Sequence, residues 1–296
     1  DYHPARMSIC VLVYIPEQIG YFARRLVVLK ICLQSIIQHT ENPYDLLIFD
    51  NGSCPEVVDF LRSLHEKGII QFLILSATNI GISGAQKIMF NAAPGEVIAY
   101  SQDDVFFYPG WLKAHLEILD TYPRVGMVSG VPVREQFRYG NRYLQPYLSD
   151  HPEVSIQHGH FIPDEWGRDF YVSTGRDPEK ELEASRTSYQ DILLEYKGIK
   201  AYSTAVHFQY VANKQVILGG LASPWEARLM AGPDVELDER IDSLGYSRLS
   251  VFQRYVRHIG NIITPEFKKS IAELGVVEKM DVWTPPTPFV ESLLHR

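Results

Sequence analysis

The chain is poor in cysteine and has no long apolar run, and each scarcity excludes a class of protein. Three cysteines, Cys10, Cys32 and Cys54, occur among 296 residues. An odd number without metal-ligand spacing predicts reduced, buried thiols, not a disulfide framework or a zinc site. No apolar stretch approaches the roughly 20 residues that span a bilayer. The segment DYHPARM at 1–7 also lacks the apolar core of a signal peptide.

Basic residues are also in the minority. The 28 Lys and Arg are outnumbered by 36 Asp and Glu, which gives a formal net charge of −8. No basic cluster is long enough to follow a phosphate backbone, so nucleic acid is not an expected partner. With 46% apolar residues the chain has material for a substantial core. We expect a cytoplasmic protein without a transmembrane segment, either free in solution or peripheral to the membrane.

Apolar runs alternate with helical patterns through the first half of the chain. The expected strands are residues 7–14, 44–50, 69–75 and 96–101, and the expected helices are 25–39, 57–64 and 84–93. This alternation predicts an α/β fold with a parallel sheet and helices on both faces. In such folds ligands bind at the carboxyl ends of the strands.

Two adjacent carboxylates, Asp103 and Asp104, follow the fourth expected strand. A lone aspartate there commonly makes a turn or caps a helix. Two neighbours repel, and each raises the pKa of the other unless a cation holds both ionised, so a divalent metal explains the pair more economically. Oxygen ligands suit Mg²⁺ or Mn²⁺, which commonly share coordination with substrate phosphates.

Several motifs occur in an order that is specific as a set. They are FDNGS at 49–53, NIGISGA at 79–85, QDDV at 102–105, PGWL at 109–112, YPRVGMVSG at 122–130, PDVELDER at 233–240 and VRHIG at 256–260. Together the segments of about residues 7–262 resemble an inverting glycosyltransferase of the GT-A fold, family two. The resemblance implies the GT-A (nucleotide-diphospho-sugar transferase) fold, with a mostly parallel central sheet.

The resemblance also assigns a donor-binding set. Asp50 would bind the nucleotide base or its ribose, and Asp103 would contact ribose or the sugar. The other positions implied for the donor come from the loop after the first strand and from NIGISGA: Ile15, Pro16, Asn79, Gly81 and Gly84. The bland alternatives are that Asp50 makes only a turn and that the two glycines belong to an ordinary loop.

The chemical roles fall on three further residues. The resemblance implies that Asp104 and His258 bind Mn²⁺ or Mg²⁺ and that Asp234 is the general base. As alternatives, Asp234 caps a helix and His258 is a hydrogen-bonded core residue. The sequence departs from the family at Gln102, where many relatives have an acid, and at Pro233, where they have a glutamate. Since proline fixes its own φ and lacks an N–H, the loop that carries Asp234 is expected to differ in shape.

The motifs also suggest how the chain is divided. Residues 1–133 would form the nucleotide-sugar-binding half, and 134–262 the acceptor-binding and catalytic half of the same domain. Residues 263–296 would form a C-terminal helix and an extended tail, which leaves a homo-oligomer open.

The function implied is metal-dependent, inverting transfer of a hexosyl or N-acetylhexosaminyl group. The donor would be a nucleotide-sugar, most commonly a UDP-sugar, and the acceptor a hydroxyl of a glycan, a lipid-linked sugar or a small molecule. The alternative is a non-catalytic nucleotide- or carbohydrate-binding module that kept the fold. A nicotinamide dehydrogenase is disfavoured, because IPEQIGYFARR at 15–25 lacks the glycine fingerprint.

Overall fold

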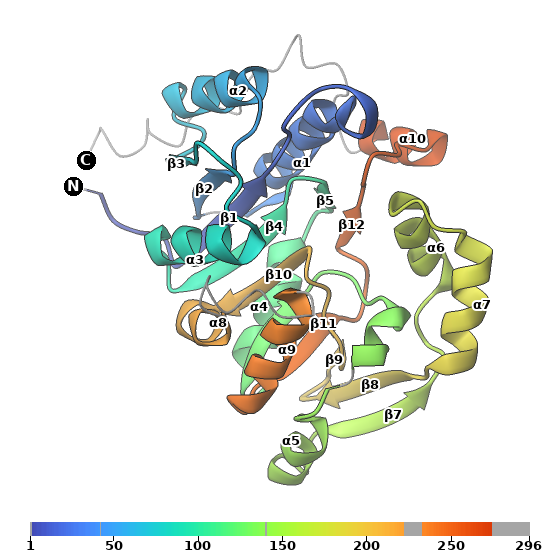
Figure 1. Cartoon of the computed structure of the whole chain (residues 1–296). Helices are drawn as coiled ribbons and strands as arrows, with labels where there is room; N and C mark the ends of the chain where they lie inside the picture. The colour runs from blue at the N-terminus through green and yellow to red at the C-terminus, as the bar shows by residue number, and fades with distance from the viewer. Residues whose placement is uncertain (1, 42, 140, 222–232, 274–296) are drawn as a thin grey trace.

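The computed structural model describes residues 2–41, 43–139, 141–221 and 233–273 (Figure 1). The strands are β1 Met7–Val13, β2 Asp45–Asp50, β3 Phe72–Leu75, β4 Val97–Gln102, β5 Val105–Phe107, β6 Val125–Ser129, β7 Ser155–Gly159, β8 Asp191–Tyr196, β9 Ile199–Tyr202, β10 Gln209–Asn213, β11 Ser247–Val251 and β12 Val256–His258. The α-helices are α1 Arg25–His39, α2 Pro55–Glu66, α3 Ile82–Ala92, α4 Trp111–Thr121, α5 Leu144–Asp150, α6 Asp164–Ser173, α7 Pro178–Ser188, α8 Lys214–Gly220, α9 Pro233–Ser243 and α10 Pro265–Glu273. Two short 3₁₀ segments, η1 Gly20–Phe22 and η2 Arg134–Tyr139, complete the set.

The first half of the chain follows the predicted alternation. β1 pairs in parallel with β2 and β4, and β2 pairs in parallel with β3. β3 begins three residues later than expected, because the N–H groups of Ile69 and Ile70 both donate to the carbonyl of Leu64 and so close the end of α2. Gly68, with φ +72°, provides the left-handed backbone that this helix ending requires.

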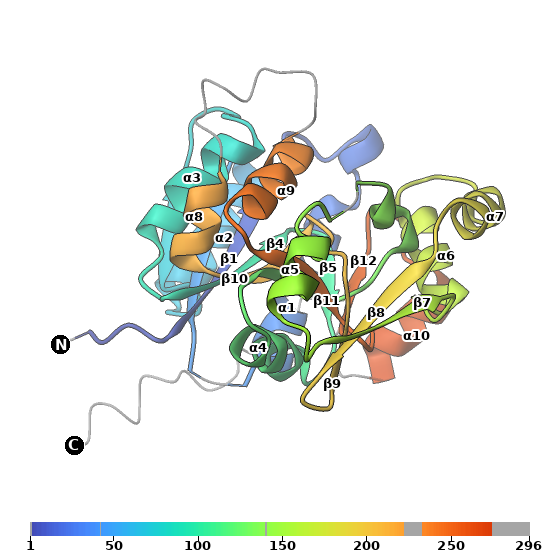
Figure 2. The same ribbon diagram turned by 90° about the horizontal axis from the view of Figure 1, so that it is seen from below.

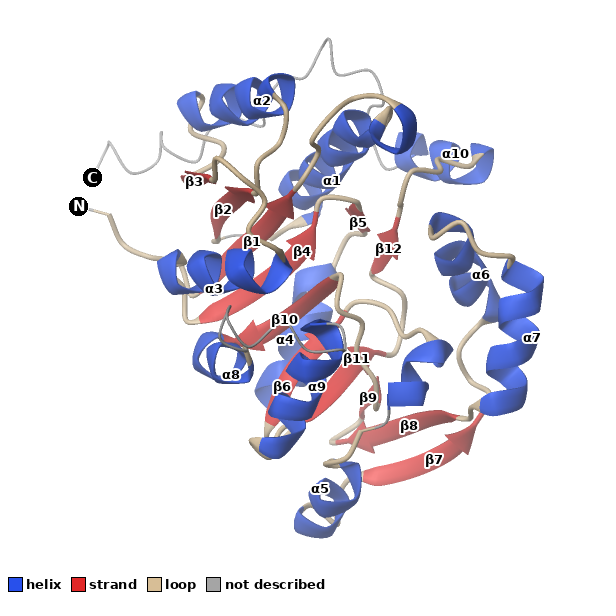
Figure 3. Ribbon diagram, in the orientation of Figure 1, coloured by secondary structure: helices blue, strands red, loops and turns tan. Residues whose placement is uncertain are grey.

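The second half turns the sheet into a mixed one. The ten-stranded order is β3-β2-β1-β4-β10-β6-β11-β9-β8-β7 (Figure 3). β10 is antiparallel to both β4 and β6, and β7, β8 and β9 form an antiparallel meander at the far edge. The α/β architecture is thus confirmed, and its parallel part is concentrated in the first half of the chain.

Helices cover both faces of the sheet. On β1, Met7, Ile9 and Val11 pack with α1, α2 and α4, whereas Cys10 and Leu12 pack with α3, α8 and α9. This is the alternation expected of a strand buried on both sides. Figure 2 shows α3, α8 and α9 on one side of the sheet and α4 on the other.

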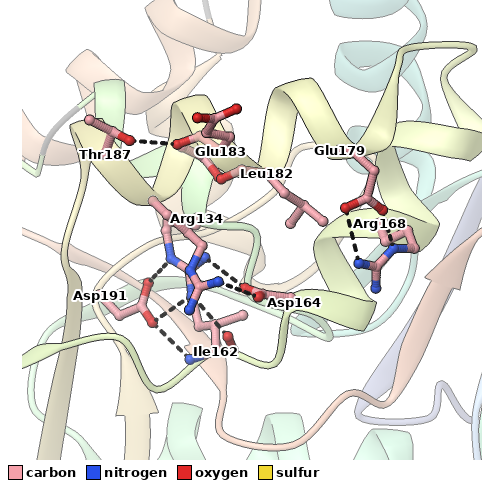
Figure 4. Close-up of polar contacts among 11 residues, drawn as sticks. Arg134, Ile162, Asp164, Arg168, Glu179, Leu182, Glu183, Thr187 and Asp191 are labelled. Atoms are coloured by element: carbon pink, nitrogen blue, oxygen red, sulfur yellow. Dashed lines mark hydrogen bonds and ion pairs between the residues drawn. The ribbon is translucent and has the colours of Figure 1, made fainter.

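A buried ion pair stabilises the second half of the chain (Figure 4). Arg134 Nε donates to Asp191 Oδ1 at 2.7 Å, and Asp191 is completely buried. Arg134 also donates to the carbonyl of Ile162 and to Asp164. Asp191 Oδ2 accepts the backbone N–H groups of Phe161 and Ile162, so the pair connects η2, the start of β8 and the segment before α6.

A two-stranded ribbon lies beside the main sheet. β12 pairs with β5 in antiparallel register, with Val256 opposite Phe107 and His258 opposite Val105. Phe106 of β5 packs edge-on against Phe267 of α10, the helix expected at the start of the C-terminal segment. The expected tail, residues 274–296, lies outside the described residues. Among the helices that are described, none has the length and apolarity needed to cross a bilayer.

Candidate active site

Several predicted site residues meet at the carboxyl edge of β1, β2 and β4. A cavity of about 330 Å³ opens there. Its lining residues come from the ends of β1 and β4, the start of α1 and the segments after β2 and β3: Leu12, Tyr14, Phe22, Arg25, Asn51, Asn79, Gly81, Ile82, Gln102 and Asp103. Among the residues predicted for the donor, Asn79, Gly81 and Asp103 line this cavity. Asp50, Ile15, Pro16 and Gly84 are not lining residues. Asp50 and Ile15 are buried, and Gly84 lies within α3.

Asp50 ends β2 and makes a turn, as the alternative to a donor-binding role predicted. Its Oδ2 accepts the N–H groups of Gly52 and Ser53 at 3.3 and 3.1 Å. The same turn is fixed to the segment after β1, because Ile15 N–H donates to Ser53 Oγ and Ile15 O accepts from Cys54 N–H. Asp50 Oδ1 remains buried without a hydrogen-bond partner, so the carboxylate keeps one acceptor beyond its turn.

Gly52 requires the absence of a side chain. Its φ is +88°, and a Cβ there would lie 2.9 Å from the carbonyl carbon of Thr78. The close approach brings the loops after β2 and β3 together. Asn51 then joins them, since its Nδ2 donates to Asn79 Oδ1 and its Oδ1 accepts the N–H of Ile80. Asn79 Oδ1 also accepts the N–H of Gly81, the N-cap residue of α3, so the asparagine of NIGISGA shapes the cavity wall.

The acidic pair lies between β4 and β5 and is almost completely buried. Asp103 and Asp104 are 3% and 5% exposed. Arg25, the first residue of α1, donates from Nη1 to Asp104 Oδ2 at 2.6 Å and from Nη2 to Asp103 Oδ1. The two terminal nitrogens of one guanidinium therefore each bind a different carboxylate.

The pKa values of the two carboxyl groups are shifted in opposite directions. Burial raises the pKa of Asp103 to about 7; the charge of Arg25 opposes this shift and the charge of Asp104 adds to it. Burial also acts to raise the pKa of Asp104, but the charges of His258 and Arg25 outweigh it and lower the pKa. Asp104 is thus the carboxylate that the site keeps ionised, as a metal ligand must be.

His258 lies next to Asp104 because of the β5–β12 pairing. Its Nε2 is 3.3 Å from Asp104 Oδ2, and the N–H of Ile259 donates to the carbonyl of Asp104 at 2.7 Å. On the other side of the ring, Nδ1 is 2.8 Å from Ser173 Oγ, and Ser173 donates its hydroxyl proton to Phe170 O. The hydroxyl oxygen therefore accepts from Nδ1–H, which leaves Nε2 as the nitrogen that faces the acidic pair.

The residues present fit a hard divalent cation with few protein ligands. Asp104 Oδ1 is buried without a hydrogen-bond partner, which leaves an acceptor for a cation. Asp104 and His258 offer one carboxylate and one imidazole, and the contact of Nδ1 with Ser173 is the kind of support that metal-bound histidines have. Within the described ranges, no group of three or more His, Cys, Asp or Glu side chains is arranged to hold a metal. Phosphate and water would therefore supply the other ligands, as is usual for Mg²⁺.

The residue predicted as the base, Asp234, falls within the first turn of α9, but its side chain lies outside the described part of the structure. One turn further on, Asp238 is buried. It accepts from Arg248 Nη1 at 2.6 Å and lies 2.8 Å from His207 Nε2. His207 directly precedes Phe208 and β10, whose first residue pairs with Ser101 near the carboxyl end of β4. The contact fixes α9 to the same edge of the sheet.

Arg25 is the residue of this site that the sequence analysis missed. A cation at the first position of a helix opposes the helix dipole, and no acidic residue occupies the first turn of α1. This unfavourable placement is the feature of the sequence that indicates an acidic partner for Arg25 outside the helix.

The mixed sheet, together with an acidic pair and a cavity at the carboxyl ends of its parallel strands, defines an α/β protein of the GT-A type. The chain belongs to glycosyl transferase family 2, whose model matches residues 22–176, just over half of the 296 residues. The match includes the acidic pair and ends before α9.

Individual relatives are distant. A glycosyltransferase of Nostoc sp. (strain PCC 7120), itself named as uncharacterized, is 28% identical over 96 residues, which cover 32% of this chain and 30% of that protein. The structure of GalNAc-T7 with UDP, GalNAc and Mn²⁺ has a TM-score of 0.53 at 12% identity over 87% of this chain and 44% of that one. S. aureus TarS 1–349 has a TM-score of 0.49 at 10% identity over 85% of this chain and 60% of that one. The chain thus spans less than two thirds of the length of each relative.

Proposed function

We propose that this protein is a metal-dependent inverting glycosyltransferase that uses a nucleotide-sugar, with a UDP-sugar as the first candidate. The observation that carries the proposal is the acidic pair, which lies beside His258 and has Asp103 in the lining of the cavity. Family membership supports the sugar-transfer chemistry, and the UDP and Mn²⁺ found with GalNAc-T7 support the choice of donor and metal.

The cavity suits a nucleoside diphosphate. Tyr14 and Phe22 pack edge-on with ring centroids 6.2 Å apart and offer an aromatic wall for a base. Asp50 Oδ1 is a buried acceptor at the same edge of the sheet, suited to a base N–H or a ribose hydroxyl. Asp103 lines the cavity and would meet the ribose or the sugar.

Asp104 and His258 would hold the metal ion, which would neutralise charge on the diphosphate as it leaves. Asp234 would accept the proton of the acceptor hydroxyl. The hydroxyl oxygen forms a bond to the anomeric carbon, and the bond from that carbon to the diphosphate oxygen breaks with its electrons on the nucleotide. A single displacement of this kind inverts the anomeric configuration.

Release of UDP from a panel of UDP-sugars, with and without Mn²⁺ and with simple saccharide acceptors, tests the proposal. We expect metal-dependent release from one donor, abolished in Asp104→Asn. Asp234→Asn should lower turnover by about 10²- to 10⁴-fold with UDP affinity unchanged. Glu239→Gln, on the exposed side of α9, is the matched control and should keep full turnover.

The remaining alternative is a module that binds the nucleotide without chemistry. It predicts that UDP raises the melting temperature while no donor loses its sugar, with or without an acceptor. That result would overturn the transferase proposal and leave the binding cavity in place.

A further inference from the structure

Arg25 occupies the position that a cation would take at the acidic pair. Its side chain is 10% exposed, and it contacts both Asp103 and Asp104. Arg25 and Asp103 both line the cavity at the carboxyl ends of β1 and β4, so this ion pair lies at the cavity wall.

The two oxygens of the Asp104 carboxylate differ in their contacts. Asp104 Oδ2 takes both the guanidinium, at 2.6 Å, and His258 Nε2, at 3.3 Å. Asp104 Oδ1 has no hydrogen-bond partner although it is buried, and neither has Arg25 Nε. Buried polar atoms without partners are costly, so a group that binds Asp104 Oδ1 would remove one such cost.

A divalent ion and the guanidinium cannot both use Asp104 without repelling each other, because both are cations and the site is shielded from water. An ion bound by Asp104 and His258 would lie within a few ångströms of Nη1. The higher charge of the ion favours its binding to Asp104. The contact of Arg25 with Asp104 is favoured because it is intramolecular and costs no translational entropy.

We propose that Arg25 is a positioning residue that holds Asp103 and Asp104 in place before metal arrives and competes with the divalent ion for them, thereby setting the metal affinity of the site. The proposal deepens the proposed function and rests on its assignment of a metal to Asp104. The diphosphate of a donor, which adds negative charge beside the guanidinium, would relieve the competition, so metal and nucleotide should bind more tightly together than either alone.

Mn²⁺ binding measured by electron paramagnetic resonance, without nucleotide or turnover, tests the proposal. We expect Arg25→Gln to bind Mn²⁺ about tenfold or more tightly than the wild type, since removal of a buried like charge favours the ion. Arg25→Lys keeps the charge and should stay within about threefold of the wild type. Arg6→Gln, which breaks an exposed pair with Asp120 elsewhere, is the control and should leave the affinity unchanged.

A second readout covers the case in which Arg25→Gln folds poorly without metal. Saturating Mn²⁺ should then raise the melting temperature of Arg25→Gln by more than it raises that of the wild type. Equal Mn²⁺ affinity and equal thermal response in the two proteins would overturn the role of Arg25 and leave the transferase proposal intact. Absence of Mn²⁺ binding in every variant, even with UDP, would overturn both this inference and the metal assignment.

Discussion

His258 Nε2 lies 3.3 Å from Asp104 Oδ2, although the two residues are 154 positions apart in the chain. The pairing of β12 with β5 brings them together, and the contact of Nδ1 with Ser173 Oγ fixes the orientation of the ring. The position of the imidazole thus depends on the strand pairing, and its orientation on α6.

Ser173→Ala removes the acceptor for His258 Nδ1–H. Without it the ring is free to change tautomer or rotate, and Mn²⁺ affinity should fall about 10- to 100-fold, the range found for residues that support metal-bound histidines. Electron paramagnetic resonance of bound Mn²⁺ provides the measurement. Ser63→Ala is the matched control, because Ser63 makes the same hydroxyl-to-carbonyl contact within α2, with Phe60. An unaltered affinity in Ser173→Ala would show that Ser173 does not support the ring.

Gly260→Ala should destabilise the fold. Gly260 has φ +60°, and a Cβ would collide with the carbonyl oxygen of Ser173, so both the backbone and the packing oppose a side chain. We expect a loss of about 2–4 kcal/mol in the free energy of unfolding, measured by urea denaturation. Gly175→Ala isolates the backbone effect, since Gly175 has φ +73° with no atom near its Cβ position. It should cost about 1 kcal/mol. Equal losses in the two variants would mean that the contact with Ser173 relaxes without cost.

The raised pKa of Asp103 gives a pH dependence of stability in metal-free buffer with EDTA. Burial raises this pKa to about 7 in the folded protein, from the ordinary aspartate value of 3.8. Between these two pH values the folded protein binds more protons than the unfolded chain, so the contribution of Asp103 to stability falls as pH rises. Asn at this position cannot titrate. The free energy of unfolding of the wild type minus that of Asp103→Asn should therefore decrease by at least about 1 kcal/mol from pH 4 to 7 and level off above pH 7. A difference that stays constant or grows with pH would contradict the assigned environment.

Arg134→Ala should cost about 3–5 kcal/mol of stability, since it leaves the completely buried Asp191 without its counter-ion. Arg168 provides a matched comparison in the same region (Figure 4), because it pairs with Glu179 in an exposed position. Arg168→Ala should change stability by less than about 1 kcal/mol. Chemical denaturation of both variants measures the contrast, and similar losses would refute the difference expected from burial.

The first half of the fold could be predicted because its signals are local. The apolar runs at β1, β2 and β4 are buried strands, and α1 covers residues 25–39 as the helical spacing indicated. The placement of Asp50, Asp103 and Asp104 at strand ends followed from the rule for parallel sheets, and the structure confirms that placement. The roles given to these residues stay predictions.

The second half depends on contacts that no local pattern reveals. β7, β8 and β9 form an antiparallel meander in the segment rich in Tyr, His and Pro, where neither strand nor helix periodicity is strong. The insertion of β10 between β4 and β6 reverses the direction of the sheet, and its register is set by pairing with residues more than 80 positions away. The ion pairs of Arg25 could not be predicted either, because its partners lie 78 and 79 residues further along the chain.

The β5–β12 ribbon holds His258 beside Asp104 outside the ten-stranded sheet. Its backbone pairing keeps the imidazole beside the carboxylate, and Phe106, Ile259 and Phe267 give it an apolar anchorage of its own against α1 and α10. Ser173, whose hydroxyl fixes the orientation of the imidazole, comes from α6, in the segment between β7 and β8. The separation of Asp104 and His258 is therefore set by three segments far apart in the sequence, and a change in any one of them is transmitted to this corner.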